Sequence, residues 1–250
     1  MSTEDPLEAG RVAFVSGASR GIGAGIARRF AARGVKLVLC SRSAPALPEG
    51  DDVLARSVDV RDAPALEGLV HEAEARFGHI DLWINNAGVL DPIEKLRDVE
   101  ADAFRTHLDI NVTGVFLGTR AYVQHLHRSG KPGVLINVSS GASTKAYEGW
   151  SAYCASKAAV DHLTRVVALE ESGNGLRAHS IAPGVVDTDM QTQIRESADE
   201  AFPEAPRFRD RKRTGHFNSA SFVADEFLSI AFDPARRTEE VVLRLEDEPR

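Results

Sequence analysis

Short apolar runs rich in β-branched residues alternate along the chain with longer segments that have helical periodicity. Because each run is short and is bounded by polar residues or glycine, the runs predict strands. Their near-continuous apolarity is typical of a parallel sheet that is covered on both faces. The predicted strands are Val12–Ser16, Val35–Cys40, Val53–Val58, Ile80–Asn85, Gly133–Val138, Leu176–Ile181 and Val241–Leu245.

The segments between these strands predict helices. In the first segment, which ends at Arg33, Ile22, Ile26 and Phe30 recur at i, i+4 and i+8, and Gly34 follows as a stop. Further helices are predicted over Asp62–Phe77, with Asp62 as the cap, over about 99–129 and 151–171, and near Ser219–Phe232. Such regular alternation requires right-handed crossovers between parallel strands. It predicts the α/β class with a doubly wound, Rossmann-type parallel sheet.

Two segments depart from this alternation. Ser43–Gly50 contains two prolines, so the helix between the second and third strands is expected to be short or absent. From about 191 to 216 the composition shifts to charged residues with two further prolines, which predicts a loop or substrate lid. No linker-like stretch precedes residue 190, so residues 1–250 are predicted to form a single domain.

Composition and charge limit what the protein binds. The chain has 250 residues, 43% of them apolar and 27% charged, as in an ordinary globular protein. Its net charge of −7 argues against nucleic acid or an anionic membrane as a partner. The acidic start lacks an apolar signal segment, and every apolar run is far shorter than the ~20 residues of a membrane span. Cys40 and Cys154 have no CxxC spacing, so a reducing, cytoplasmic location is expected.

Two other polar patterns add no separate function. His125 and His127 stand i, i+2 on a predicted helix and point apart, so no metal site is expected. Residues 207–213 include five basic residues together with Asp210. This segment predicts a solvated or phosphate-attracting flap rather than a nucleic-acid patch.

A glycine-rich turn follows the first strand. The strand runs directly into SGASRGIG, which places Gly17, Gly21 and Gly23 at a strand-to-helix junction. Glycine is needed there because a pyrophosphate must approach the backbone closely, where the N–H groups and dipole of the following helix face the anion. A glycine triplet alone is weak evidence, but at a first strand-to-helix turn it predicts a dinucleotide site. The alternative is a turn that serves packing only.

The end of the second strand bears on the choice of cofactor. A carboxylate there would bind the adenosine ribose of NAD and repel a 2′-phosphate. The chain has Cys40, Ser41 and Arg42 instead, and Arg20 precedes the second glycine of the turn. Two guanidinium groups beside a serine hydroxyl form a phosphate site, which predicts NADPH. The alternative is that both arginines are solvated loop residues.

A second group of residues predicts carbonyl chemistry. Tyr153 and Lys157 stand four apart on a predicted helix and share one face, although Lys157 could be an exposed helix lysine. Ser140 ends the fifth strand, at the edge where open α/β sheets bind ligands. Reduction of a ketone needs an acid, so Tyr153 is the expected proton donor, Lys157 lowers its pKa and Ser140 binds the carbonyl oxygen. Because neighbours on a strand point to opposite faces, Ser139 could face the pocket instead.

These motifs together resemble the short-chain dehydrogenase/reductase family over about residues 11–190. The glycines have its Gly-x-x-x-Gly-x-Gly spacing, with Ser16 where the family usually has threonine, and Ser140 precedes Tyr153 by the family's 13 residues. The resemblance implies that Asn111 completes a catalytic tetrad by holding a water that returns protons to the site. The alternative is that Asn111 braces the backbone after the fourth strand.

The resemblance also implies a nicotinamide cofactor site. In it Asp59-Val60 holds the adenine amino group, the segment Asn85–Gly88 lines the cofactor, and the Pro183–Thr188 segment holds the nicotinamide carboxamide. For Asn85 and Asn86 a turn role is the alternative. The implied cofactor residues are Gly17, Ser19, Arg20, Gly21, Ile22, Gly23, Ser41, Arg42, Asp59, Val60, Asn86, Ala87, Gly88, Tyr153, Lys157, Pro183, Gly184, Val186 and Thr188.

A closer resemblance covers residues 137–196. There GW before Tyr153, AYC around it and DTDMQ after the Pro-Gly pair look like the sepiapterin reductase branch and its bacterial benzil reductase relatives. This branch implies reduction of a ketone, or of one carbonyl of a vicinal pair, on a flat aromatic or heteroaromatic compound. Tyr147, Trp150 and Met190 could form a stacking wall for such a substrate, although Trp150 could equally belong to the core.

Other implications of the resemblance concern the chain end and assembly. The branch can anchor a pterin through a carboxylate near its end, for which Glu246 or Asp247 is the candidate, with solvent charges as the alternative. Family members usually pair through two long helices, so a homodimer or homotetramer is expected. The alternative functions are a 3-oxoacyl-thioester reductase, another short-chain alcohol dehydrogenase, or a non-catalytic dinucleotide sensor. The intact Ser140, Tyr153 and Lys157 argue against the sensor.

Overall fold

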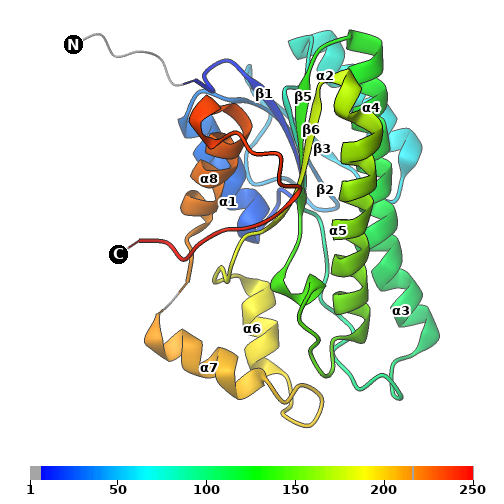
Figure 1. Cartoon of the computed structure of the whole chain (residues 1–250), viewed down its shortest axis with the longest axis vertical. Helices are drawn as coiled ribbons and strands as arrows, with labels where there is room; N and C mark the ends of the chain where they lie inside the picture. Colours follow the sequence, from blue (N-terminus) through cyan, green and yellow to red (C-terminus); the bar gives the residue numbers. More distant parts are fainter. Residues whose placement is uncertain (1–6, 216, 250) are drawn as a thin grey trace.

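Parallel strands form one sheet in the computed structural model, which describes residues 7–215 and 217–249. In this described part the sheet has seven strands in the order β3-β2-β1-β4-β5-β6-β7, and each neighbouring pair is parallel (Figure 1). The strands are β1 (Val12–Ser16), β2 (Lys36–Ser41), β3 (Val53–Ser57), β4 (Leu82–Asn85), β5 (Gly133–Val138), β6 (Leu176–Ala182) and β7 (Val242–Arg244). The strand order reverses at β1, which confirms the doubly wound, Rossmann-type α/β fold.

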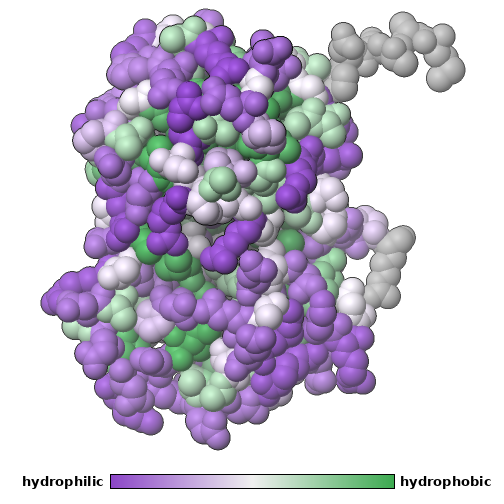
Figure 2. Space-filling view, turned by 180° about the vertical axis from the view of Figure 1, so that it is seen from behind, coloured by the Kyte–Doolittle hydropathy of each residue, from purple (hydrophilic) through white to green (hydrophobic). Residues whose placement is uncertain are grey.

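Helices cover both faces of the sheet. The α-helices of the described residues are α1 (Gly21–Ala32), α2 (Ala63–Phe77), α3 (Ala101–Leu108), α4 (Gly114–Ser129), α5 (Ser151–Glu171), α6 (Asp189–Glu196), α7 (Ala205–Thr214) and α8 (Ala220–Phe232). α1 and α8 pack together on one face, whereas α2, α4 and α5 cover the other (Figure 1). Hydrophilic side chains cover most of the surface seen from behind (Figure 2). No helix of the described part is long and apolar enough to cross a bilayer.

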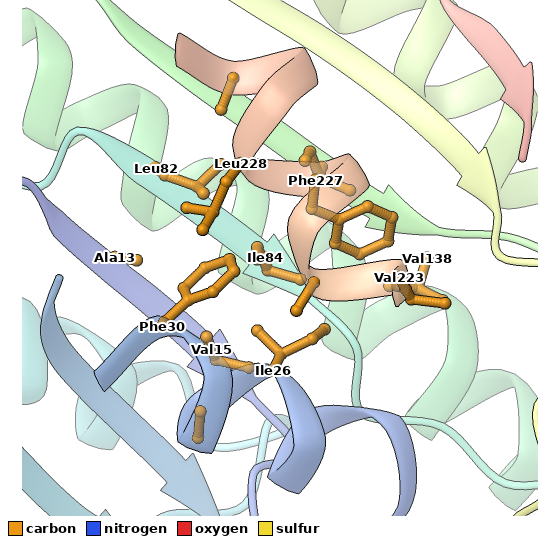
Figure 3. Close-up of a cluster of buried hydrophobic side chains, with 14 of the residues drawn as sticks. Ala13, Val15, Ile26, Phe30, Leu82, Ile84, Val138, Val223, Phe227 and Leu228 are labelled. Atoms are coloured by element: carbon orange, nitrogen blue, oxygen red, sulfur yellow. The ribbon is translucent and has the colours of Figure 1, made fainter. Parts of the chain in front are cut away.

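The alternation of side chains along the central strands builds one core on each face. Ala13 and Val15 of β1 point toward α1 and α8 and belong to the cluster drawn in Figure 3. Phe14, between them, points to the opposite face, where its ring stacks on that of Trp83 in β4 with centroids 3.5 Å apart. Because both faces of each central strand are buried, the strands are apolar almost throughout.

The strand predictions are confirmed with bounds that differ by two residues or fewer, and Ser43–Gly50 contains no helix. The helical stretch predicted over about 99–129 is confirmed, with a π-helical turn (Asp109–Thr113) between α3 and α4. The prediction of a loop over 191–216 is wrong, because α6 and α7 occupy most of this stretch, whereas its role as a lid stays a prediction. Ile194, Phe202 and Ala205 supply buried apolar positions there despite the surrounding charge.

Glu74 joins α2 to α4 through a buried histidine. Its Oε1 atom accepts hydrogen bonds from His125 Nδ1 at 2.8 Å and from Arg128 at 2.7 Å. His125 Nε2 accepts the Ile80 N–H at 3.1 Å, so the ring proton must sit on Nδ1. Burial opposes ionisation of Glu74, but its hydrogen bonds outweigh burial and lower its pKa from 4.5 to about 2. Burial also lowers the pKa of His125.

Glu74→Gln tests this contact. The folded-state pKa of Glu74 lies below its unfolded value, so its ionisation stabilises the fold fully above about pH 4.5 and progressively less toward pH 2. The substitution is expected to cost about 1.5–3 kcal/mol of unfolding free energy at pH 7 and to flatten the pH dependence below pH 4.5. Urea denaturation across this range measures both effects. Glu67→Gln, on an exposed position of the same helix, is the control, and an equal loss in both variants would contradict the assignment.

Candidate active site

The predicted site residues lie where loops leave the carboxyl ends of the parallel strands. This edge is the ligand-binding edge of open α/β sheets. In chain order they are Gly17, Ser19 and Arg20 after β1; Gly21, Ile22 and Gly23 at the start of α1; Ser41 and Arg42 at the end of β2; Asp59 and Val60 after β3; Asn86, Ala87 and Gly88 after β4; Asn111 in the π turn; Ser140 after β5; Tyr153 and Lys157 on α5; and Pro183, Gly184, Val186 and Thr188 after β6.

The turn after β1 has no room for a side chain at Gly17 or Gly23. Gly17 and Gly21 have φ of +68° and +56°, in the left-handed region that favours glycine. A Cβ atom at Gly23 would lie 2.3 Å from the Gly17 carbonyl oxygen. The bare backbone therefore lies beside the N-terminus of α1, where free N–H groups attract an anion. This cradle fits the pyrophosphate of a dinucleotide.

The hydroxyl of Ser16 ties this turn to the loop after β4. Its Oγ atom accepts the N–H groups of Asn86 at 3.0 Å and of Ala87 at 3.1 Å. In return, Asn86 Nδ2 donates to the carbonyl oxygens of Ser16 at 3.0 Å and of Gly17 at 3.3 Å. The Asn85 amide is buried and donates to Asn137 Oδ1 at 2.8 Å, which joins β4 to β5. The two asparagines thus brace the sheet edge.

Ser140, Tyr153 and Lys157 meet at the ends of β5 and α5. Tyr153 and Lys157 are 8% and 7% exposed, so Lys157 is not a surface lysine. The Tyr153 hydroxyl is hydrogen-bonded to the Ser140 side chain. Ser140 Oγ also accepts the Ala142 N–H at 3.2 Å, which leaves its proton for another acceptor. Lys157 Nζ donates to the Val138 carbonyl at 2.8 Å and lies 5.7 Å from the centroid of the Tyr153 ring.

Burial controls the protonation of these groups. It raises the pKa of Tyr153, and the hydrogen bond with Ser140 offsets only part of the rise. Burial also lowers the pKa of Lys157 to about 8, against the opposing effect of the Asp161 carboxylate. Lys157 is not among the groups that shift the pKa of Tyr153 here, so the expectation that it lowers this pKa stays a prediction. The ammonium is held by the carbonyl of Val138 rather than by the phenol oxygen.

Ser139 is not the serine of the pocket. Its hydroxyl donates to Asp161 Oδ1 at 2.5 Å, and the hydroxyl of Ser180 on β6 donates to the same oxygen at 2.6 Å. Asp161 is 3% exposed and lies one helical turn after Lys157 on α5. The alternation of side chains along the strand thus sends Ser139 toward the helix and leaves Ser140 beside Tyr153.

Asn111 braces the backbone that follows β4. Its Oδ1 accepts the Val89 N–H and its Nδ2 donates to the Val89 carbonyl, both at 2.8 Å. The second Nδ2 proton faces His107 Nε2 at 2.9 Å. These contacts match the bracing alternative, whereas a role in holding water stays a prediction. The π turn that carries Asn111 is a feature often found at functional sites.

Residues 11–199 match the short chain dehydrogenase family. The chain belongs to this family. It is therefore an oxidoreductase that acts on CH–OH or C=O groups with a nicotinamide dinucleotide. The resemblance inferred from the glycine turn and from Ser140, Tyr153 and Lys157 is thereby confirmed.

Individual relatives show which members of the family this chain resembles. The 2-(R)-hydroxypropyl-CoM dehydrogenase of Xanthobacter autotrophicus is 36% identical over 236 residues, which cover 90% of this chain and 92% of the relative. A benzil reductase ((S)-benzoin forming) of Bacillus subtilis is 31% identical over 87% of this chain and 91% of its own. Among solved structures, the KRED1-Pglu enzyme has a TM-score of 0.82 at 37% identity, with 89% and 95% of the two chains covered. The likeness to benzil reductases is confirmed, and the likeness to sepiapterin reductases stays a prediction.

The segments predicted to bind the adenosine end of the cofactor contain Arg20, Arg42 and Arg61. Arg20 pairs with Asp189 at 3.6 Å, and both side chains are about three-quarters exposed, so the pair contributes little to stability. Hydrogen bonds from Arg61, and then the nearby charge of Arg42, hold the pKa of Asp59 below its usual range. Asp59 binds Arg61 through two side-chain contacts of 3.0 and 2.7 Å. The adenine role of Asp59 and the convergence of Arg20 and Arg42 on one phosphate stay predictions.

Asn218, just before α8, fixes the loop after β6. Its Nδ2 donates to the Pro183 carbonyl at 3.0 Å. Gly184 has φ of +75°, and a Cβ atom there would lie 2.6 Å from the same Nδ2. This loop, through Thr188, and the Gly21 end of the glycine turn line one cavity of about 290 Å³. The two segments therefore face each other, as the family resemblance implies.

Aromatic residues fill the space between α5 and the two helices α6 and α7. Trp150 is 4% exposed and stacks on Phe202 with centroids 4.4 Å apart, while Tyr153 meets it edge-on at 5.4 Å. These contacts support the interpretation of Trp150 as core. Tyr147 and Met190 are half-buried at the margin of the same cluster.

The basic residues of α7 are neutralised by nearby carboxylates. The ion pairs are Arg207–Glu204, Arg209–Asp199, Arg211–Asp247, Lys212–Asp187 and Arg213–Asp210. The charges of this segment are thus balanced locally, and its role as a solvated or phosphate-attracting flap stays a prediction. Asp247 faces Arg211 at 3.7 Å, and the Glu246 carbonyl accepts Asn218 Nδ2 at 3.2 Å. Both contacts hold the chain end against the protein, and a role of the Glu246 or Asp247 carboxylate in binding a substrate stays a prediction.

Sequence reasoning missed three residues of this region. His107 and Asp161 stand on helices at positions that no motif singles out, and each is buried only because of the tertiary fold. Phe202 lies in the charged stretch before α7, where an aromatic residue among charges is the one available signal. Buried polar side chains of this kind support a site without contacting its ligand.

Ser16→Ala and Ser16→Thr test the link between the glycine turn and the loop after β4. Alanine leaves the buried N–H groups of Asn86 and Ala87 without their acceptor, which should cost about 1–3 kcal/mol of unfolding free energy. The loosened turn should weaken cofactor binding about tenfold, equivalent to about 1.4 kcal/mol. Threonine keeps the hydroxyl and should match the natural protein. Urea unfolding and fluorescence titration with NADP(H) measure the effects, and equal behaviour of both variants would disprove the role of the hydroxyl.

Proposed function

We propose that the protein is an NADPH-dependent carbonyl reductase that reduces a ketone, or one carbonyl of a vicinal diketone, to an alcohol. The observation that carries this proposal is that the side chains of Ser140, Tyr153 and Lys157 lie close together at the ligand-binding edge of the sheet, with Tyr153 and Lys157 buried. The likeness to benzil reductases supports a diketone on an aromatic compound as the substrate.

The residues of the site have distinct roles in this reaction. The bound nicotinamide supplies a hydride to the carbonyl carbon. Ser140 donates its hydroxyl proton in a hydrogen bond to the carbonyl oxygen and stabilises the charge that develops there. Tyr153 donates its proton to the same oxygen, so that one hydride and one proton complete the alcohol. Lys157 orients the nicotinamide ribose and places a positive charge beside the phenolate that remains.

The protonation of the site favours reduction. The raised pKa of Tyr153 keeps the phenol protonated at neutral pH, which is the form that an acid catalyst needs. Lys157, with a pKa of about 8, is mostly protonated under the same conditions. Above that pH the lysine loses its charge, and the phenolate left by proton transfer loses its electrostatic support.

The substrate faces the aromatic cluster in this proposal. Tyr147 and Met190, which are half-buried, form the wall on which a flat substrate stacks, and Trp150 supports them from the core. α6 and α7 together form the lid over this wall. The main alternative substrate, a 3-oxoacyl-thioester, would not need such a wall. The wall therefore favours a flat substrate over a thioester. A sensor without turnover would not need the acid.

We further propose a cytoplasmic homodimer or homotetramer as the working form. Phe116 on α4 and Val166 and Leu169 on α5 are exposed apolar side chains, with 46%, 38% and 80% of their surface accessible. Such side chains on neighbouring helices suit contact with a second copy of the chain.

A substrate panel, measured with the natural protein and with Tyr153→Phe, tests the proposed reaction. Benzil, sepiapterin and an acetoacetyl thioester are each incubated with NADPH, whose absorbance reports turnover. Benzil is expected to be reduced fastest, and Tyr153→Phe should lower kcat about 10²- to 10⁴-fold, the usual contribution of a general acid. Because the aromatic ring remains and only the hydroxyl is lost, NADPH affinity should stay unchanged. A preference for the thioester, or near-normal turnover by the variant, would refute the assignment.

Arg42→Asp tests the cofactor choice. The natural protein is expected to have a higher kcat/KM with NADPH than with NADH, because Arg42 and Arg20 would bind the 2′-phosphate. The aspartate should repel that phosphate and accept hydrogen bonds from the ribose, so the preference should fall at least about tenfold and shift toward NADH. Arg28→Asp, an exposed position on α1, controls for the change of charge. A natural preference for NADH would overturn the proposal.

A further inference from the structure

His107 is buried beside the candidate site although it belongs to none of the motifs of the chain. It lies on the last turn of α3 and is 1% exposed. Its ring meets that of Tyr153 edge-on, with centroids 6.1 Å apart. A buried histidine at this distance from a candidate acid needs a physical explanation, because an unpartnered imidazole would cost free energy.

The partners of His107 fix its tautomer. Nδ1 lies 2.6 Å from the Asp91 carbonyl oxygen, which can only accept, so Nδ1 must carry the proton. In the neutral ring Nε2 is then a bare acceptor. The Asn111 amide faces it at 2.9 Å through Nδ2, and the orientation of that amide is fixed because Oδ1 accepts the Val89 N–H. Donor therefore meets acceptor at each of these contacts.

The same nitrogen reaches the catalytic helix. Ser156 Oγ lies 3.0 Å from His107 Nε2 and 2.8 Å from the Tyr153 carbonyl oxygen, so its single proton can be donated to either acceptor. Ser156 stands between Tyr153 and Lys157 on α5. His107 thus connects α3, the π turn and α5 at one point.

We propose that His107 is a positioning residue, which in its neutral form holds the Asn111 amide against α5 and in its protonated form releases it. Protonation would place an N–H on Nε2, which would then donate to Ser156 Oγ and could no longer accept from the Nδ2 of Asn111. The amide cannot turn over to relieve this contact without losing both hydrogen bonds to Val89. The proposal rests on the proposed function, because His107 acts through Asn111 and Tyr153.

The charges around His107 determine when this release occurs. Burial is the largest influence and lowers its pKa, the Asp91 carbonyl raises it, and the ammonium of Lys157 lowers it further. The Asp91 carboxylate also raises it, and Asn111 and Ser156 are neutral. The ring is therefore neutral at pH 7, and turnover should decline only at a pH below the ordinary 6.5 of histidine.

Two substitutions separate positioning from simple packing. His107→Gln can donate to the Asp91 carbonyl and accept from Asn111, but it does not titrate. His107→Leu fills a similar volume without either hydrogen bond. His179→Leu is the matched control, because His179 is 2% exposed on β6 and has no contact with Ser140, Tyr153 or Lys157. Each variant is measured for thermal unfolding and for kcat and KM from about pH 5 to 9.

His107→Leu is expected to lower kcat at pH 7 about 10- to 100-fold, as a misplaced catalytic group does, with an unchanged KM for NADPH. His107→Gln should restore most of this loss and should remove the decline at acid pH. His179→Leu should lower stability without changing the pH profile. A folded His107→Leu with normal kcat, or a His107→Gln with the natural acid decline, would overturn the proposal.

An NMR measurement distinguishes a failure of the His107 proposal from a failure of the proposed function. Spectra that correlate the imidazole nitrogens with ring protons report the tautomer of each histidine without any substrate, and His107→Gln identifies the signals of His107. A proton on Nδ1 and a bare Nε2 at pH 7 are expected. The opposite tautomer, or a cation at pH 7, would overturn the role of His107 even in an active reductase. If no ketone is reduced, the proposed function fails, and the NMR result then decides whether His107 holds Asn111.

Discussion

Hydrogen bonds from buried side chains to the backbone hold the carboxyl edge of the sheet, and the site depends on them. Where a strand ends, its loop leaves the ladder, and the N–H and C=O groups of the loop need other partners. Ser16, Asn86 and Asn111 supply these partners. Each is short or rigidly bonded, so the loops that would contact a ligand are fixed before it arrives.

The loop after β4 connects the phosphate end of the site to its chemical end. At its start, Asn86 and Ala87 are bonded to Ser16 beside the glycine turn. A few residues later, Val89 is bonded to Asn111, whose amide faces His107 and, through it, the helix that carries Tyr153. A shift at either end of this loop would therefore be transmitted to the other by contiguous hydrogen bonds. This continuity explains why polar residues that touch no ligand are buried there.

The sequence predicts the sheet well because burial on both faces leaves a direct signal, the continuous apolar run, at strands such as Val12–Ser16. It predicts the glycine turn and Tyr153 because steric and chemical demands there exclude most residues. The π turn at Asp109–Thr113 has no such signal, since its residues suit an ordinary helix. The helices α6 and α7 escaped prediction because charge dominates their composition, and a few apolar residues such as Phe202 suffice to bury one face. His107 is significant only through partners far away in the sequence.

Burial shifts the pKa values of the two ionisable groups of the site in opposite directions. It favours the neutral form of each, so it raises the pKa of the Tyr153 phenol and lowers that of the Lys157 ammonium to about 8. The two pKa values, which ordinarily lie close together, thereby move apart, and the Asp161 carboxylate below Lys157 limits the shift of the lysine. Without Asp161 the lysine would lose its charge nearer to neutrality, and the phenolate left after proton transfer would have no cation beside it. The buried acid that no motif identified therefore preserves the charge of Lys157, on which the proposed reaction relies.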